Sequence, residues 1–399
     1  MRYQAALRPE PAILGYGTDL AGTADWRHAL QHGVYRAGTK MLRQFYTVPK
    51  PSCLSPSFAA MPQSTMRILL DELLSADALE LVDQLALPRS WLTCSDPNAV
   101  SRGELALAMA QALFARLAQT VPEAMRYIER ARKQGRSITF DHGAVRTVLA
   151  PCCGALPCGE AAVTRILLPL GYTQAGTYPL PRLGMTGRAY IHIDDPQGIP
   201  QFFVSELHPE GFSAAFQQTV STVLRASRDP LGPADHDALQ ALRREGHLAF
   251  DTARQLLPAL LRCFERQHPL PSLAQYQLLL RESAEMAWIS TEGQTFNHAT
   301  DRVDDVLELA AQLRAEGFAI KDQVEVSSSG TVRQTALRAA SMQRALLGED
   351  GPRLHDLPGS FFEFISRDAR SGGALPADMD MRFDSGNATG IFKMTATSP

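Results

Sequence analysis

Three short segments of this 399-residue chain each carry a metal-ligand type of side chain and, four residues later, an arginine. Each segment has the composition of a β-strand, in which residues two and four apart share a face. We therefore predict three strands that each present an aromatic residue, a ligand type and an arginine on one face. The predicted faces are Phe140, His142, Ala144 and Arg146; Phe296, His298, Thr300 and Arg302; and Phe361, Glu363, Ile365 and Arg367.

Two imidazoles and one carboxylate are a ligand set that suits a metal ion. They occupy one face of an octahedral ion and leave the opposite face open, as in non-haem Fe(II) oxygenases. The open positions can take O2 and a 2-oxo acid, bound through its carboxylate and keto oxygens. The ion and its ligands would keep a net positive charge, which favours an anionic substrate. An arginine about 13 Å along the strand can lean back to hold a second carboxylate.

The same residues also have ordinary structural interpretations. A histidine in a strand is commonly a hydrogen-bonded core or surface residue, and a glutamate beside two phenylalanines can protect an edge strand. Glu325, in the segment QVEV, is a rival carboxylate for Glu363. The residue pattern alone leaves these interpretations open.

The elements around these segments predict an α+β fold. Helical periodicity runs from Glu104 to a Gly135 cap, and a large helical insert spans residues 212–292, with one long helix from Leu273 to Ile289. On either side of the insert the order is strand, helix, strands. This order indicates two βαβββ units that form a central sheet around the metal site. The segment QVEVSSSGTVRQTALRA predicts a hairpin that turns at Ser329 and Gly330.

The composition argues against several classes of protein. The net charge is -3, so the chain lacks the basic surplus of a nucleic-acid-binding protein. No apolar run reaches the roughly 18 residues of a membrane span, and the N-terminus lacks the apolar core of a signal peptide. We therefore expect a cytoplasmic protein with neither a nucleic-acid nor a membrane partner.

The six cysteines do not form spaced C-x-x-C pairs, which argues against a zinc ribbon. Three of them cluster in PCCGALPC, as Cys152, Cys153 and Cys158. We predict a loop of reduced thiols there, and binding of a soft metal is the alternative.

Residues 1–65 show no steady period and contain scattered Pro and Gly, so we predict a poorly ordered lead before a catalytic domain of residues 66–399. A sequence that resembles a second start, MRILLDELL, begins at Met66. Our hypothesis is that the lead is a mis-called start, which mass spectrometry of the native N-terminus would test.

Six motifs occur along the chain in a fixed order: DHGAVRTV, FVSEL, TFNHATDRV, QVEVSSSGTVRQTA, GSFFEFISRD and NATGIFK. This ordered set resembles the 2-oxoadipate dioxygenase/decarboxylase family, which is related to the vicinal-oxygen-chelate metalloenzymes. The resemblance implies that His142, His298 and Glu363 hold Fe(II) and that Arg146 grips a substrate carboxylate. It favours Glu363 over Glu325, and it implies that the NATGIF segment closes over the substrate.

The resemblance also implies a reaction, in which 2-oxoadipate and O2 give 2-hydroxyglutarate and CO2 in lysine catabolism. Two alternatives stay open. One is another chelate-fold metalloenzyme, such as a glyoxalase-like isomerase or an extradiol dioxygenase, and the isomerase would consume no O2. The other is a non-catalytic binding member of the fold.

Overall fold

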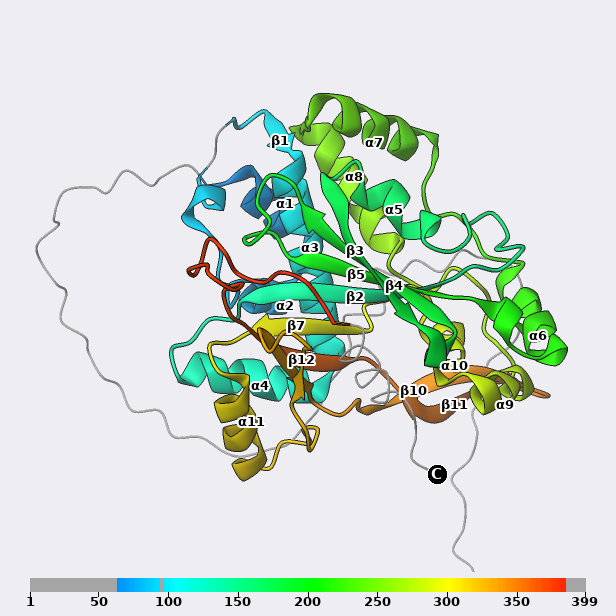
Figure 1. Cartoon of the computed structure of the whole chain (residues 1–399). Helices are drawn as coiled ribbons and strands as arrows, with labels where there is room; N and C mark the ends of the chain where they lie inside the picture. The colour runs from blue at the N-terminus through cyan, green and yellow to red at the C-terminus, as the bar shows by residue number, and fades with distance from the viewer. Residues whose placement is uncertain (1–62, 94–95, 385–399) are drawn as a thin grey trace, which may run out of the picture. The chain divides into compact units, whose positions relative to one another are not determined.

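A computed structural model describes residues 63–93 and 96–384, and its centre is an eight-stranded mixed sheet. The strands are β2 (Phe140–Val148), β3 (Tyr172–Leu180), β4 (Met185–His192), β5 (Gln201–Leu207), β7 (His298–Arg302), β8 (Glu325–Val326), β9 (Val332–Ala336) and β12 (Phe361–Arg367). Their order in the sheet is β3-β4-β5-β2-β7-β12-β9-β8. Figure 1 shows β2, β7 and β12 side by side near the centre of the molecule. The sheet curls into a half-barrel, which confirms the predicted α+β class.

The sheet consists of two units with the same topology. The first unit runs β2, α5 (Ala161–Leu167), β3, β4, β5, and the second runs β7, α11 (Val306–Ala315), β8, β9, β12. In each unit the first and fourth strands are parallel neighbours, and the second strand lies at the outer edge. The two first strands, β2 and β7, pair antiparallel at the centre of the sheet. The predicted duplication of a βαβββ unit is therefore confirmed, with a further hairpin inserted before β12.

One face of the sheet carries the larger apolar core. Helix α3 (Arg102–Thr120) begins with a capping box between Ser101 and Glu104, and α4 (Pro122–Lys133) follows it directly. Their apolar side chains share one buried cluster with Phe362 and Phe364 of β12. Because side chains alternate along a strand, Glu363 between them points to the opposite face.

The expected insert contains five helices and one short strand. The helices are α6 (Ala214–Leu224), α7 (Pro233–Glu245), α8 (Phe250–Arg262), α9 (Leu273–Glu282) and α10 (Ala284–Glu292), and β6 (His247–Ala249) pairs with β1 (Ala99–Ser101). The predicted single helix from Leu273 to Ile289 is wrong. Ser283 has extended backbone, and its hydroxyl accepts a hydrogen bond from the Met286 amide to cap α10. No helix in the described ranges is long and apolar enough to cross a membrane.

Two further elements lie outside the predictions. The hairpin of β10 (Ser341–Gly348) and β11 (Gly351–Pro358) has no counterpart in the expected elements. At the other end, α1 (Thr65–Leu73) is capped by Ser64, and the Thr65 hydroxyl donates to Glu104 of α3 at 2.5 Å. The fold therefore includes residues 63–65 of the predicted lead, and residues 1–62 lie outside the described ranges.

Candidate metal centre

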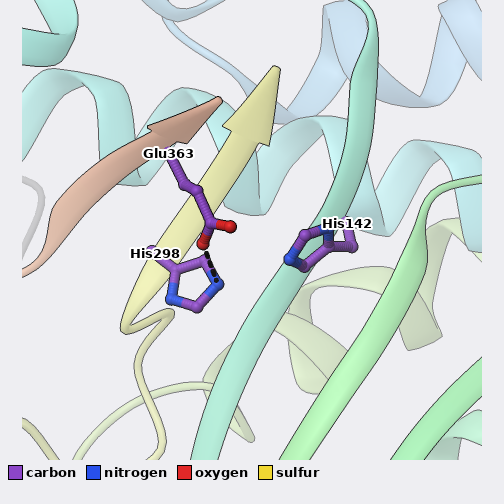
Figure 2. A group of neighbouring side chains, drawn as sticks. All are labelled: His142, His298 and Glu363. Atoms are coloured by element: carbon purple, nitrogen blue, oxygen red, sulfur yellow. Dashed lines mark ion pairs between the residues drawn. The ribbon is translucent and has the colours of Figure 1, made fainter. Parts of the chain in front are cut away.

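Three buried side chains from neighbouring strands converge on the sheet face opposite α3 (Figure 2). One ligand-type atom from each of His142, His298 and Glu363 lies within 4.8 Å of the other two. The strand register explains this convergence, because His298 pairs with Ala144 of β2 and Glu363 pairs with Thr300 of β7. The structure therefore brings the three predicted ligand residues into one cluster.

A β-bulge in β2 changes which residues share its faces. Phe140 pairs with Asp301 and His142 pairs with Thr300, so Asp141 is an extra residue without a partner position in β7. A bulge interrupts the alternation of side chains. Phe140 therefore joins the core packed on α3, and our expectation that it shares a face with His142 is wrong.

The predicted face of the second strand also needs correction. Strand β7 begins at His298, and Phe296 lies before it, with its ring 5.5 Å from that of Phe202 and 6.0 Å from that of Phe264 in the helix-side core. Phe296 therefore does not share the face of His298. In β12 the prediction holds, because the Phe361 ring lies 4.9 Å from the His298 ring.

The residue before each histidine orients its imidazole ring. His142 Nδ1 donates to the Asp141 carboxylate at 2.8 Å, and His298 Nδ1 donates to Asn297 Oδ1 at 3.0 Å. With Nδ1 protonated, the neutral ring presents a lone pair on Nε2, which is what a metal requires. The Thr300 hydroxyl lies 3.1 Å from His142 Nε2, as expected for a donor to that lone pair.

Glu363 is wholly buried, and neither of its carboxylate oxygens accepts a hydrogen bond from any residue within the described ranges. Oε2 lies 3.1 Å from His298 Nε2 (Figure 2). Burial, followed by the charge of Glu325, raises the pKa of Glu363 well above its usual range. Burial, followed by the charges of His142 and Arg146, lowers the pKa of His298 well below its usual range.

Both shifts favour the neutral form of these two groups over an ionic pair when no metal is bound. A buried carboxyl group without hydrogen bonds is costly unless a ligand compensates it. A divalent cation would satisfy the carboxylate and the two Nε2 lone pairs together. The donor set therefore fits a metal such as Fe(II).

We expect metal affinity to rise with pH, because the metal must displace the proton of Glu363. The lowered pKa of His298 means that its ring is already neutral, so the carboxyl group is the source of the released proton. One released proton corresponds to about a tenfold gain in affinity per pH unit, up to the raised pKa of Glu363. Anaerobic calorimetric titration in two buffers with different ionisation enthalpies measures the release, and an affinity that does not depend on pH would contradict it.

A cavity lies directly against the three side chains. A covering segment, which we define as residues 380–384, contributes Phe383 and Asp384 to the lining of this cavity. The Phe383 ring meets the His142 ring edge-on at 4.8 Å and packs 5.0 Å from Phe203. The cavity is lined by His142, Ala144, Val145, Phe203, Ser205, Asn297, His298, Gln334, Glu363, Phe383 and Asp384. The predicted NATGIF loop, residues 387–392, lies outside the described ranges.

Arg146 is buried four residues beyond His142 on β2. Its guanidinium lies 5.0 Å from the ring centre of Trp288 in α10, so the helical insert contributes to its surroundings. Burial lowers the pKa of Arg146 to about 10, although the charge of Glu285 acts in the opposite direction. The side chain therefore stays positively charged at neutral pH. Its charge also lowers the pKa of His298, which places it near the metal centre.

The other arginines on the predicted faces have carboxylate partners. Arg367 binds Asp141 at 2.8 Å, and Arg302 lies 3.6 Å from the same carboxylate. Arg333 pairs with Asp368 at 2.8 Å, and we assign it no role in binding substrate. Arg146 stays the predicted residue for a substrate carboxylate, because it lies on β2 with His142 and its charge acts on His298.

The rival carboxylate and the cysteine cluster lie outside the triad. Glu325 Oε1 accepts from Lys321 Nζ at 2.5 Å, and the metal-ligand group found in the described ranges contains Glu363 instead. Cys152, Cys153 and Cys158 form no disulfide in the structure, and the loop of reduced thiols stays a prediction. Burial raises the pKa of Cys153 to about 12, so this thiol stays protonated at neutral pH.

Sequence reasoning missed the residues that orient the ligands and cover the cavity. Asp141 and Asn297 precede the two histidines in sequence, and an acidic or amide residue at that position is a detectable signal. Phe383 carried no signal, because it approaches His142 from a distant segment.

Comparison with known proteins identifies the family and the fold. The family model for 2-oxoadipate dioxygenase/decarboxylase matches residues 106–374. No curated protein matches the sequence. Among solved structures, a protein from Ralstonia eutropha JMP134 assigned to the glyoxalase superfamily is 47% identical, with a TM-score of 0.76, and the match covers 81% of this chain and 99% of that one.

Two hydroxyglutarate synthases solved in complex with 2-oxoadipate share the fold at lower identity. The Oryza sativa enzyme is 19% identical with a TM-score of 0.57, and the match covers 78% of this chain and 95% of that one. The Pseudomonas putida enzyme is 18% identical with a TM-score of 0.53, and the match covers 75% of this chain and 74% of that one.

Proposed function

The chain belongs to the 2-oxoadipate dioxygenase/decarboxylase family, and we propose that it converts 2-oxoadipate and O2 to 2-hydroxyglutarate and CO2 at an Fe(II) ion held by His142, His298 and Glu363. The observation that carries the proposal is the buried cluster itself. Both imidazoles have Nδ1 bound to a neighbouring side chain, so each directs its Nε2 toward the cluster, and a carboxylate without hydrogen bonds from the described residues lies beside them. The substrate class further suggests a place in lysine catabolism, in the cytoplasm.

The protein would contribute position and charge to this reaction. Fe(II), when bound, supplies the chelation of the 2-oxo acid and the activation of O2. Asp141 and Asn297 hold the two histidine rings in the tautomer that can bind the metal. Glu363 supplies the negative charge of the ligand set, so that an anionic substrate still meets a net positive centre.

The other side chains would orient the substrate and limit the access of water. Arg146 would hold the distal carboxylate, which fixes the carbon chain relative to the metal. Phe203 and Phe383 present apolar surface to the cavity beside the ligands. Ser205 and Gln334 also line the cavity, so a dicarboxylic 2-oxo acid would meet both apolar surface and groups that can form hydrogen bonds.

The experiment that tests this proposal is O2 uptake by anaerobically purified protein reconstituted with Fe(II). We expect O2 and 2-oxoadipate to disappear together, with 2-hydroxyglutarate and CO2 detected by mass spectrometry. Protein without added metal is the control. Iron-bound protein that consumes no O2 would overturn the proposal and favour the isomerase alternative, which shares the ligand set but needs no O2.

A further inference from the structure

Arg367 is fully buried and contacts two separate parts of the metal centre. On one side, its Nη2 and Nε donate to the Asp141 carboxylate at 2.8 and 3.0 Å. Asp141 in turn accepts the Nδ1 hydrogen of His142. Arg367 therefore acts on a ligand ring through one intervening side chain and does not touch the ligand itself.

On its other side, Arg367 binds the covering segment. Nη1 donates to the main-chain carbonyls of Asp380 and Arg382, both at 2.8 Å. The guanidinium also lies 5.1 Å from the ring centre of Phe383. The Phe383 ring in turn meets the His142 ring edge-on, and its amide donates to the Tyr178 hydroxyl at 3.1 Å.

The planar guanidinium matters for this arrangement. Its donors point in fixed directions, so one side chain can hold a carboxylate and two carbonyls at the same time. A lysine would keep the charge but present a single nitrogen, which cannot reach all three acceptors. Arg302 lies farther from the same carboxylate, at 3.6 Å, and its Nη2 donates to the Gln197 carbonyl instead of the covering segment.

We infer that Arg367 is a positioning residue that couples the orientation of His142 for metal binding to the placement of residues 380–383 over the site. The inference rests on the metal site proposed above. Metal binding favours the ring orientation that Asp141 imposes, and the same guanidinium anchors the covering segment. Metal binding and coverage of the site therefore stabilise each other.

The test uses Co(II) as the probe, in the full-length protein, with Arg367→Lys as the variant and Arg333→Lys as its matched control. Arg333 pairs with Asp368 by two hydrogen bonds on the same part of the sheet, away from the ligands. The first measurement is Co(II) affinity, from a titration followed by the visible absorption of the bound metal. The second is the rate of hydrogen exchange of the peptide containing Phe383, with and without Co(II).

In the wild type, we expect Co(II) to slow exchange at Phe383. Arg367→Lys should weaken Co(II) binding by about 10- to 100-fold, the range for groups that orient metal ligands, and should abolish this slowing. Arg333→Lys should change neither quantity. Wild-type affinity together with wild-type protection in Arg367→Lys would overturn the inference. If the wild type binds no Co(II), the proposed metal site fails, and the inference fails with it.

A second comparison separates coupling through Asp141 from general destabilisation. In an Asp141→Asn background, adding Arg367→Lys should weaken Co(II) binding little further, because both changes interrupt the same path. If the double variant instead loses Co(II) affinity by the product of the two single-variant factors, Arg367 does not act through Asp141.

Discussion

The His298→Ala protein is expected to fold and to bind no iron. The substitution removes one of three ligand side chains, and it removes the imidazole whose Nε2 lies 3.1 Å from the buried carboxyl group of Glu363. Two remaining ligands cannot hold the ion against the cost of deprotonating a carboxyl group whose pKa burial has raised. We expect O2 uptake to fall by more than about 1,000-fold, since metal catalysis contributes several kcal/mol.

His192→Ala is the matched control for this experiment. His192 is also fully buried, and its Nε2 binds the Leu170 carbonyl at 2.7 Å, but it does not line the cavity. Each variant loses a buried imidazole and a hydrogen bond, at a cost of about 1–3 kcal/mol in the free energy of unfolding. Iron content by mass spectrometry should fall in His298→Ala alone. A normal iron content in that variant would show that His298 is not a ligand.

The Arg146→Lys protein is expected to keep its iron and to bind 2-oxoadipate poorly. Lysine preserves the positive charge near Glu285, but it cannot form the bidentate pair of hydrogen bonds that a guanidinium forms with a carboxylate. A hydrogen bond to a charged group contributes about 1.5–3 kcal/mol, so kcat/KM should fall by about 10- to 100-fold, chiefly through KM.

Substrate comparison identifies which carboxylate Arg146 binds. The compound 2-oxohexanoate has the same carbon chain as 2-oxoadipate but lacks the distal carboxylate. Arg146→Lys should reduce the preference for 2-oxoadipate over 2-oxohexanoate, whereas Arg333→Lys should leave it unchanged. If the preference is unaffected in Arg146→Lys, the distal carboxylate is held elsewhere, and Arg302 is the next residue to test.

Much of the fold followed from local patterns. The helical periodicity from Glu104 to Gly135 predicted the region of α3 and α4, and the order of strands and helices on either side of the insert predicted the repeated βαβββ unit. Patterns failed where a single residue changed the local conformation. Ser283 divides a continuous apolar repeat into two helices, because its extended backbone and its capping hydroxyl end one and begin the next.

The metal site was predictable in its residue types, and the ordered motifs singled out His142, His298 and Glu363. Its detailed geometry was not. The bulge at Asp141 places that carboxylate beside His142, but the bulge depends on how β2 pairs with β7, more than 150 residues away. The positions of Arg367 and Phe383 depend likewise on contacts between distant segments.

The sequence by itself therefore determined most of the elements, their duplication and the ligand types that they carry, because side-chain periodicity and helix caps are local properties of the chain. The tertiary structure alone decided the strand register that brings His298 opposite Ala144 and Glu363 opposite Thr300. It also decided that Arg367 binds Asp141 and that Phe383 covers His142. Register and these contacts depend on packing between residues far apart in the chain, which no local pattern encodes.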